Sequence, residues 1–175
     1  MDWYDTVFEL IDMRSFSNLW FWIALAVTWS SASHWVLGVP WDMAIRARKG
    51  KNEQAIADFE DMVRINTNRI LYVVRESGLL MAGITAFLTT TLALLGFVYH
   101  NEFAQALFLL GFPLLIVGGL SVRVAQRISV LGLNGAILIK RLQTHRFFIQ
   151  LIGMLSIFVT AMWGMYQNMN ANVLG

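Results

Sequence analysis

Residues 103–122 read FAQALFLLGFPLLIVGGLSV, twenty residues without one charged side chain. A helix of about 20 residues is roughly 30 Å long, which matches the hydrocarbon core of a bilayer. Lipid offers no hydrogen-bond partner to an open sheet edge, so a segment of this kind crosses the membrane as a helix. The stretch therefore predicts a transmembrane helix over residues 103–122.

Three other stretches are equally free of charge, namely residues 18–40, 77–101 and 147–175. They predict further transmembrane helices at about 18–38, 77–99 and 147–167. The composition agrees, because 57% of the residues are hydrophobic and only 14% are charged, against about 25% charged in soluble domains. The expected fold is all-α: one membrane domain over residues 1–175, built as a four-helix transmembrane bundle.

The basic residues divide the segments between the spans. Of the 13 lysines and arginines, 12 fall in the connections 39–76 and 123–146. Loops rich in Lys and Arg stay on the cytoplasmic side, so both termini are predicted on the opposite side. No patch interleaves bases with aromatic residues, so we expect contacts to anionic lipid headgroups and no nucleic-acid binding. The predicted headgroup contacts are Arg46, Arg48, Lys49, Lys51, Arg123, Arg127, Lys140 and Arg141.

Helical patterns extend beyond the spans. Both basic connections predict cytoplasmic helical extensions, with one helix running from about 53 to 99 and a turn at residues 132–135. Residues 1–16 predict an amphipathic helix on the outer surface. Its polar face is acidic, which favours a protein contact over anionic lipid. The predicted partner interface comprises Trp3, Tyr4, Val7, Phe8, Leu10 and Ile11.

His34 is the only ionisable residue inside a predicted span. Ionisable groups inside a membrane are costly and are often functional. Hydroxyl residues precede it, so this half of the helix forms a candidate intramembrane polar cluster of Thr28, Ser30, Ser31 and His34. Such a cluster could gate a pore or sense pH. Alternatively, a neutral histidine bonded to a neighbouring hydroxyl or carbonyl helps helices to associate.

The sequence lacks the groups that most enzyme chemistry needs. It has no cysteine, which excludes disulfides, thiolate-held clusters and cysteine nucleophiles. The three histidines lie at different depths of the predicted topology, so they cannot converge on one metal or haem. Spans two to four contain no charged residue or histidine, which removes acid–base pairs. We expect a protein that is not an enzyme and binds no cofactor and no metal.

Small and hydroxyl residues in the second and third spans indicate close helix packing in lipid. Packing within the chain is the first expectation, and an interface with a second copy or a partner is the alternative. The residues concerned are Thr85, Thr89, Thr90, Thr91, Gly111, Gly118 and Gly119.

Residues 1–40, MDWYDTVFELIDMRSFSNLWFWIALAVTWSSASHWVLGVP, and residues 149–168, IQLIGMLSIFVTAMWGMYQN, resemble a known family. It is a small uncharacterised family of bacterial inner-membrane proteins described as "component of SufBCD complex", and the resemblance covers essentially the whole chain in length and layout. It implies the bacterial inner (plasma) membrane and a link to iron–sulfur cluster assembly. In that membrane the orientation predicted from the basic loops makes both termini periplasmic. With no cysteine and no convergent histidines, the implied role is to dock soluble assembly proteins on the cytoplasmic helices.

The sequence thus predicts a non-catalytic accessory, scaffold or assembly subunit of a larger inner-membrane complex. Its expected partners are membrane lipids and other membrane-protein subunits, or further copies of itself. The alternative is a homo-oligomeric channel or small-solute pore lined by the hydroxyls of the second span and the polar cluster around His34. An enzyme acting on lipid is the least favoured class, because neither side offers a nucleophile–base pair.

Overall fold

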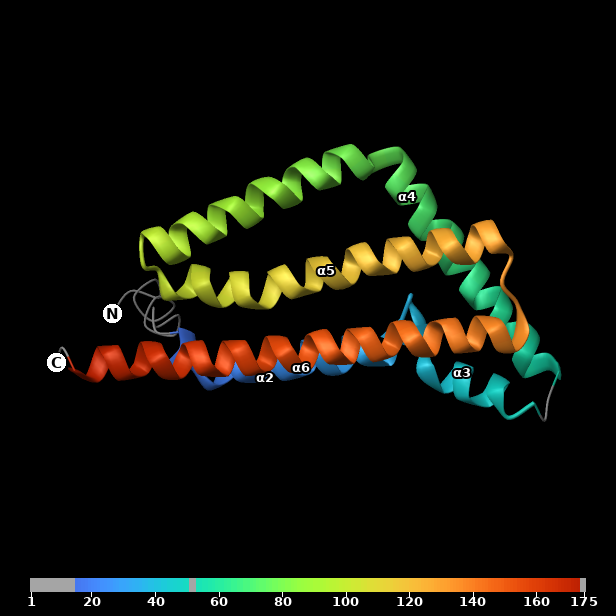
Figure 1. The fold of residues 1–175 in the computed structure, drawn as a ribbon, viewed down its shortest axis with the longest axis horizontal. Coiled ribbons are helices and arrows are strands. Elements are labelled where there is room, and N and C mark those ends of the chain that lie inside the picture. Colours follow the sequence, from blue (N-terminus) through green and yellow to red (C-terminus); the bar gives the residue numbers. More distant parts are fainter. Residues whose placement is uncertain (1–14, 51–52, 174–175) are drawn as a thin grey trace, which may run out of the picture.

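The computed structural model of the protein describes residues 15–50 and 53–173, and side chains as far as residue 169. These parts of the chain are helical except for one short hairpin (Figure 1). In chain order the elements are η1 (Ser15–Ser17), α2 (Leu19–His34), β1 (Trp35–Val36), β2 (Val39–Pro40), α3 (Trp41–Arg48), α4 (Glu53–Ala93), the π-helix η2 (Leu94–Val98), α5 (Glu102–Leu131) and α6 (Gly135–Val173).

Within the described residues, three helices are long and apolar enough to cross a membrane. They are α4 continued by η2 (Glu53–Val98), α5 (Glu102–Leu131) and α6 (Gly135–Met169). The predicted spans 77–99, 103–122 and 147–167 lie within them except for residue 99. The predicted extensions over 53–76 and 123–146 are helical apart from the turn at 132–134. The chain is therefore an all-α membrane protein by the length and composition of its helices.

The first predicted span is shorter as a helix than the sequence indicated. α2 has 16 residues and ends at His34 rather than at residue 38, so it is only about 24 Å long. The chain continues as an antiparallel hairpin in which Val36 pairs with Val39. Leu37 and Gly38 form the turn with φ of +54° and +73°, the left-handed values that two-residue hairpin turns require. Hydropathy alone missed this hairpin because Val36 and Leu37 are as apolar as the helix before them.

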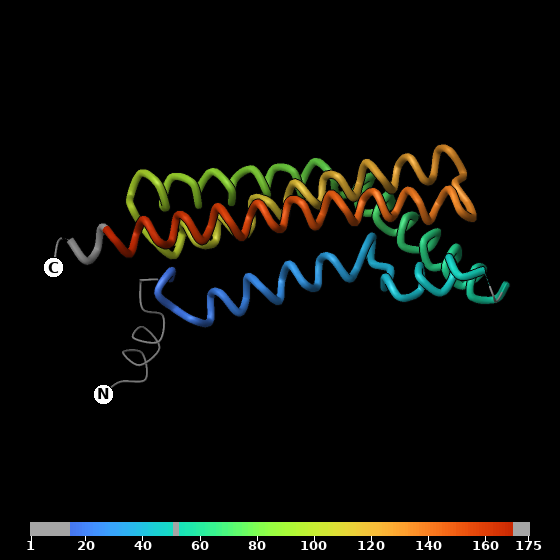
Figure 2. The backbone as a smooth tube through the Cα atoms, turned by 60° about the horizontal axis from the view of Figure 1, so that its bottom comes forward, coloured from blue at the N-terminus to red at the C-terminus, as the bar shows by residue number. Residues whose placement is uncertain are grey.

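The helices lie side by side along one long axis. α5 and α6 run antiparallel, and α2 lies beside α6 while α4 lies on the opposite side of the pair (Figures 1 and 2). We call the end that holds α3, the first half of α4 and the α5–α6 turn the basic end. The contacts between α2 and α6 follow one antiparallel register, pairing Phe16 with Gly164, Trp29 with Gly153 and Ser33 with Arg146.

The buried core is concentrated at the basic end. It joins the hairpin to α4, α5 and α6 through Val36, Leu37, Val39, Phe59, Val63, Ala125, Ile128, Leu138 and Leu142. Towards the other end most large apolar side chains of α4, α5 and α6 are exposed. Water drives apolar side chains together, whereas lipid tails are as apolar as the side chains themselves. The tight core at the basic end therefore fits an aqueous surrounding, and the exposed apolar side chains towards the other end fit a surrounding of lipid.

The turn between α5 and α6 forms where glycine and asparagine predicted it. Gly132 ends α5 in the left-handed conformation, and its N–H bonds the carbonyl of Ile128. α6 begins at Gly135, whose N–H donates to Oε1 of Glu60 at 2.6 Å. A carboxylate at a helix N-terminus satisfies a free N–H and complements the helix dipole. This bond ties the turn to α4.

Candidate functional site

The predicted polar cluster lies on the surface of the bundle. Ser30, Ser31 and His34 are exposed and Thr28 is half-buried. The ring of His34 lies edge to face with the neighbouring ring of Trp35, with 6.0 Å between centroids. The structure keeps these residues on one helix, and among the described residues no hydrogen bond or ion pair joins their side chains to another helix. A polar contact from α6 reaches this segment at the backbone of Ser33.

A different charged side chain anchors the end of α2. Nε of Arg146 donates to the carbonyl of Ser33 at 3.0 Å, and its guanidinium carbon lies 4.7 Å from the ring centroid of Trp41. The last carbonyls of a helix lack intrahelical partners, and cations near them are stabilising. Arg146 therefore joins α2, α3 and α6 at one point. The sequence analysis missed this role, since no local pattern links residue 146 to residue 33.

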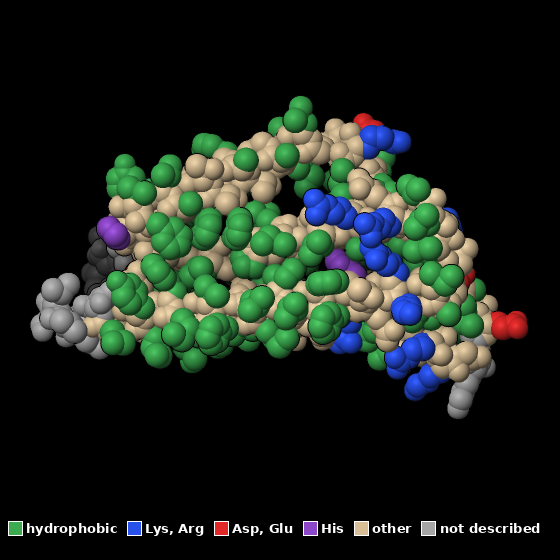
Figure 3. All heavy atoms as spheres, viewed as in Figure 1, with side chains coloured by type: hydrophobic (Ala, Val, Ile, Leu, Met, Phe, Trp, Pro, Cys, Tyr) green, Lys and Arg blue, Asp and Glu red, His purple; other side chains and the backbone are tan. Residues whose placement is uncertain are grey.

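The predicted headgroup contacts form two groups, which meet where Arg48 of α3 and Lys140 of α6 line a common hollow. In the first group Arg127 of α5 lines a second hollow with Lys140 and Arg141 of α6, and Arg123 lies one turn away from Arg127 on α5. Figure 3 shows Lys and Arg side chains gathered towards one end of the α5–α6 face. The second group is exposed on α3 and comprises Arg46, Arg48 and Lys49. Arg46 is paired with Asp42 at 2.7 Å. Lys51 lies outside the described residues.

Gln105 is the most connected polar side chain at the end opposite the basic end. It is 1% exposed, and its Nε2 donates to the carbonyl of Gly96 in η2 at 2.8 Å. Its Oε1 accepts from Nε1 of Trp163 at 2.9 Å and from Nε2 of Gln167 at 2.6 Å. One amide thus joins η2, α5 and α6. The available signal was the single amide in the otherwise apolar span 103–122.

Gly96 allows this junction to form. A β-carbon on Gly96 would lie 3.0 Å from the backbone nitrogen of Gln105 and 3.2 Å from its Cα. Backbone atoms cannot move aside as a flexible side chain can, so the close approach of η2 to α5 requires glycine. π-helical turns recur at functional sites, and here the turn directs the carbonyl of Gly96 to a buried amide.

Some of the other glycines contact a neighbouring helix, whereas others have open space where a β-carbon would lie. Gly153 lies against Trp29, and Gly164 lies against Phe16, so both serve the contact between α2 and α6. By contrast, β-carbons on Gly83, Gly111, Gly118 or Gly119 would meet no atom within 4 Å. For Gly118 and Gly119, which are exposed, the first expectation of packing within the chain is therefore wrong. Gly111 instead lines the shallow hollow between α4 and α5.

The membrane half of α4 lies along α5 but buries little of its own surface. α4 bends sharply midway (Figure 1), and Ser77-Gly78, a pair typical of helix kinks, lies near its middle. Beyond the bend none of its most apolar 18-residue stretch is buried, against 11% for α5 and 28% for α6. Thr85 and Thr89 line a shallow hollow towards α5, whereas Thr90 is exposed.

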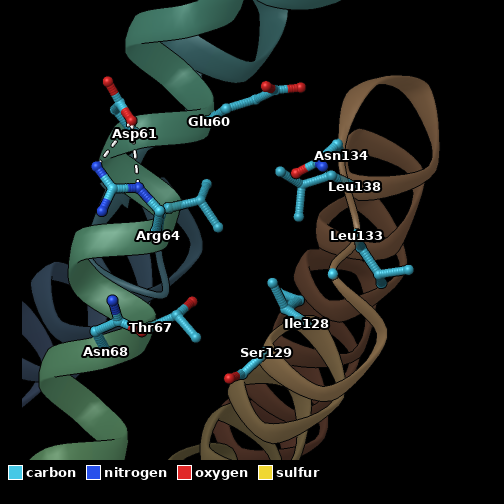
Figure 4. A pocket seen from close by; sticks show the side chains of 12 residues that line it. Glu60, Asp61, Arg64, Thr67, Asn68, Ile128, Ser129, Leu133, Asn134 and Leu138 are labelled. Atoms are coloured by element: carbon cyan, nitrogen blue, oxygen red, sulfur yellow. Dashed lines mark hydrogen bonds and ion pairs between the residues drawn. The ribbon is translucent and has the colours of Figure 1, made fainter.

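A polar cavity of about 360 Å³ opens between α4 and the α5–α6 turn at the basic end (Figure 4). Arg64 on its wall is paired with Asp61 at 3.0 Å, and Glu60 is bonded to Gly135. The hydroxyl of Thr67 is buried without a hydrogen-bond partner among the described residues. Charged groups on the wall are thus already engaged with one another or with the turn.

Over residues 15–50 and 53–173, no group of three or more His, Cys, Asp or Glu side chains is placed to hold a metal ion. His145 is buried and lies with Nε2 3.0 Å from the hydroxyl of Ser121. The predicted partner interface (Trp3, Tyr4, Val7, Phe8, Leu10 and Ile11) lies outside the described residues. Comparisons with protein-family models, curated proteins and solved structures find no match for the chain.

Proposed function

We propose that the protein is a non-catalytic accessory, scaffold or assembly subunit of a larger complex in the bacterial inner membrane. The main support for the proposal is the lack of burial along the membrane half of α4. A chain that only had to fold would gain by packing this helix against α5 and α6, yet no residue of its most apolar stretch is buried. We infer that α4 is held open for a helix of another subunit.

The surface of α4 suits such a contact. Helices associate in lipid through small and hydroxyl residues, which permit close approach of the backbones. Gly83 and Thr90 are exposed on the membrane half of α4, and no atom lies within 4 Å of a β-carbon on Gly83. The exposed glycines Gly118 and Gly119 offer similar notches on α5. A partner helix would find places for close contact on both.

The proposed topology has four spans, with both termini periplasmic. Its support is the register between α2 and α6, because η1 and α2 together follow α6 from Gly164 to Arg146. Those 18 helical steps cover roughly 27 Å, close to the hydrocarbon thickness. A helix that accompanies a spanning helix over this distance crosses the same layer, even though α2 is itself short.

The register predicts a disulfide. Cβ of Phe16 lies 3.3 Å from the β-carbon position of Gly164, near the 3.5–4.5 Å that disulfides show. The variant F16C/G164C is expected to cross-link, and F16C/I157C, displaced by seven residues of α6, is not. Because the natural chain has no cysteine, non-reducing electrophoresis detects the disulfide between the two introduced cysteines without interference from other thiols. Spontaneous oxidation in cells would support a periplasmic location for this end, and cross-linking of the control pair alone would contradict the register.

Photocross-linking in native membranes tests the role of α4. Phe87 on α4 and Phe158 on α6 have similar exposures of 70% and 63%, so a photoreactive residue at either site meets comparable surroundings in an isolated monomer. We expect a discrete protein adduct from position 87 and a much weaker one from position 158. Lipid adducts alone at both sites, together with a native mass of a bare monomer after mild detergent extraction, would contradict the proposal.

The alternative of a channel finds no support from a particular observation. Its polar path would have to bring the threonines of α4 together with Ser30, Ser31 and His34. Those threonines border α5, whereas α2 lies beside α6 on the opposite side of the bundle (Figure 2). Flux of ions or small solutes into liposomes that contain the purified protein would revive this alternative.

A further inference from the structure

Three cations share one hollow on the α5–α6 face at the basic end, and a fourth, Arg123, lies nearby on α5. The hollow measures about 350 Å³ and is lined by Arg127, Lys140 and Arg141 with Leu131, Ile137 and Thr144. Arg123 lies one turn above Arg127 on the same side of α5. Within the described parts of the chain none of these four cations is in an ion pair, and no carboxylate lines the hollow. The site therefore carries a concentrated, uncompensated positive charge.

An apolar groove lies between the same two helices, closer to the middle of the predicted spans. It measures about 290 Å³, and its walls are Phe112, Pro113 and Ile116 of α5 and Ile152 and Leu155 of α6, with almost no polar surface. Ile116 and Arg123 are seven residues apart, about 10 Å along α5. That distance is within one leaflet of roughly 15 Å.

The spacing of residues aligns the two features. On α5, Phe112, Ile116, Arg123 and Arg127 follow steps of four, seven and four, which keep to one side of a helix. On α6, Arg141, Phe148, Ile152 and Leu155 follow steps of seven, four and three on the matching side. On each helix the cations therefore lie nearer the basic end, and the apolar side chains follow on the same side towards the middle of the predicted span.

We propose that this face binds one anionic phospholipid, with its phosphate in the cationic hollow and an acyl chain in the apolar groove. Basic pockets between membrane helices recognise anionic headgroups, and arginine binds phosphate oxygens in a bidentate manner. A soluble phosphate would use the hollow alone. The groove above it is what points to a lipid, and the absence of a lining carboxylate is what selects a negative headgroup over a zwitterionic one.

The exposed bases of α3 offer a matched comparison. Arg46 and Lys49 are equally cationic, but Arg46 is paired with Asp42 and neither lines the hollow or the groove between α5 and α6. The variants R127Q/R141Q and R46Q/K49Q therefore remove the same charge from the two groups. A third variant, I116W, fills the groove at a half-exposed position and leaves all charges in place.

The experiment measures lipid binding to the full chain in detergent by native mass spectrometry, titrating phosphatidylglycerol or phosphatidylcholine. The wild type is expected to retain one phosphatidylglycerol in preference to phosphatidylcholine. R127Q/R141Q is expected to bind it about tenfold or more weakly, since each base near a membrane surface contributes roughly fivefold. R46Q/K49Q is expected to bind as the wild type does, and I116W is expected to lose affinity with its charges intact.

Three outcomes would overturn the proposal. Equal weakening by the α3 variant would mean that net charge alone attracts the lipid. Unchanged binding in R127Q/R141Q would place the lipid elsewhere. Unchanged binding in I116W, with millimolar inorganic phosphate displacing the lipid completely, would mean that the hollow binds phosphate without an acyl chain. Thermal unfolding of each variant in the same detergent verifies that the fold is retained.

Discussion

Replacing Gly153 by leucine is expected to detach α2 from α6. A β-carbon at this position would already lie 2.8 Å from Cε3 of Trp29 and 3.1 Å from its Cδ2. Trp29 is a rigid, buried ring held inside the core cluster, so it cannot turn aside as a flexible side chain would. Overpacking of this kind destabilises by about 1–3 kcal/mol even for a few added atoms, and leucine adds four carbons.

The matched control is Gly118→Leu, because a β-carbon on Gly118 meets no atom within 4 Å. Both variants replace a helical glycine by the same apolar residue, so the gain in helix propensity is common to both. Unfolding in mixed detergent micelles, followed by tryptophan fluorescence and by the F16C/G164C cross-link, measures the difference. We expect loss of the cross-link in the Gly153 variant alone. Equal stability of the two variants would contradict the observed contact.

Replacing Gln105 by leucine is the second prediction with a large expected effect. It removes hydrogen bonds to Gly96, Trp163 and Gln167 at once and leaves the polar groups of all three without this partner. Hydrogen bonds between membrane helices contribute about 0.6 kcal/mol on average and up to about 1.7 kcal/mol each. We therefore expect a loss of roughly 2–5 kcal/mol for three bonds. The end near Gln105 would loosen first, since the main core lies at the basic end.

A double-mutant cycle with Trp163→Phe tests this account. The phenylalanine variant removes the indole N–H that donates to Oε1 of Gln105, together with part of a ring that contacts Phe97 and Tyr166. The part of its cost that comes from the hydrogen bond should therefore vanish in the Gln105→Leu background, while the packing part remains. Gln150→Leu on the exposed face of α6 serves as the control for replacing an amide by leucine. Additive effects of the Gln105 and Trp163 substitutions would refute the hydrogen-bonded junction.

Prediction from the sequence succeeded where the physical cause is local. Hydropathy over some 20 residues depends only on neighbouring side chains, so the apolar parts of α4, α5 and α6 could be located. Gly132 and Gly135 indicated the turn for the same reason. The hairpin at residues 35–40 could not be predicted, because its apolar residues continue the pattern of α2 and its turn is stabilised by burial against distant helices.

The candidate sites show the same division. Charge spacing identified the bases of α5 and α6, but only the antiparallel pairing of these helices brings Arg127 and Arg141 to one hollow. His34 drew attention as an ionisable residue in a span, and the structure leaves it on the surface. Gln105 was not predicted as a site residue, yet its amide joins η2, α5 and α6.

The amino-acid sequence by itself determined two features of this chain: its long apolar helices, and the location of nearly all its lysines and arginines in two connections between the predicted spans. Each feature follows from the composition of a short stretch of sequence. Which glycines are used, where α2 stops and which polar side chains meet were decided only by the tertiary structure. Those contacts join residues such as Ser33 and Arg146, more than one hundred positions apart. Their register depends on how whole helices pack, which no local window contains.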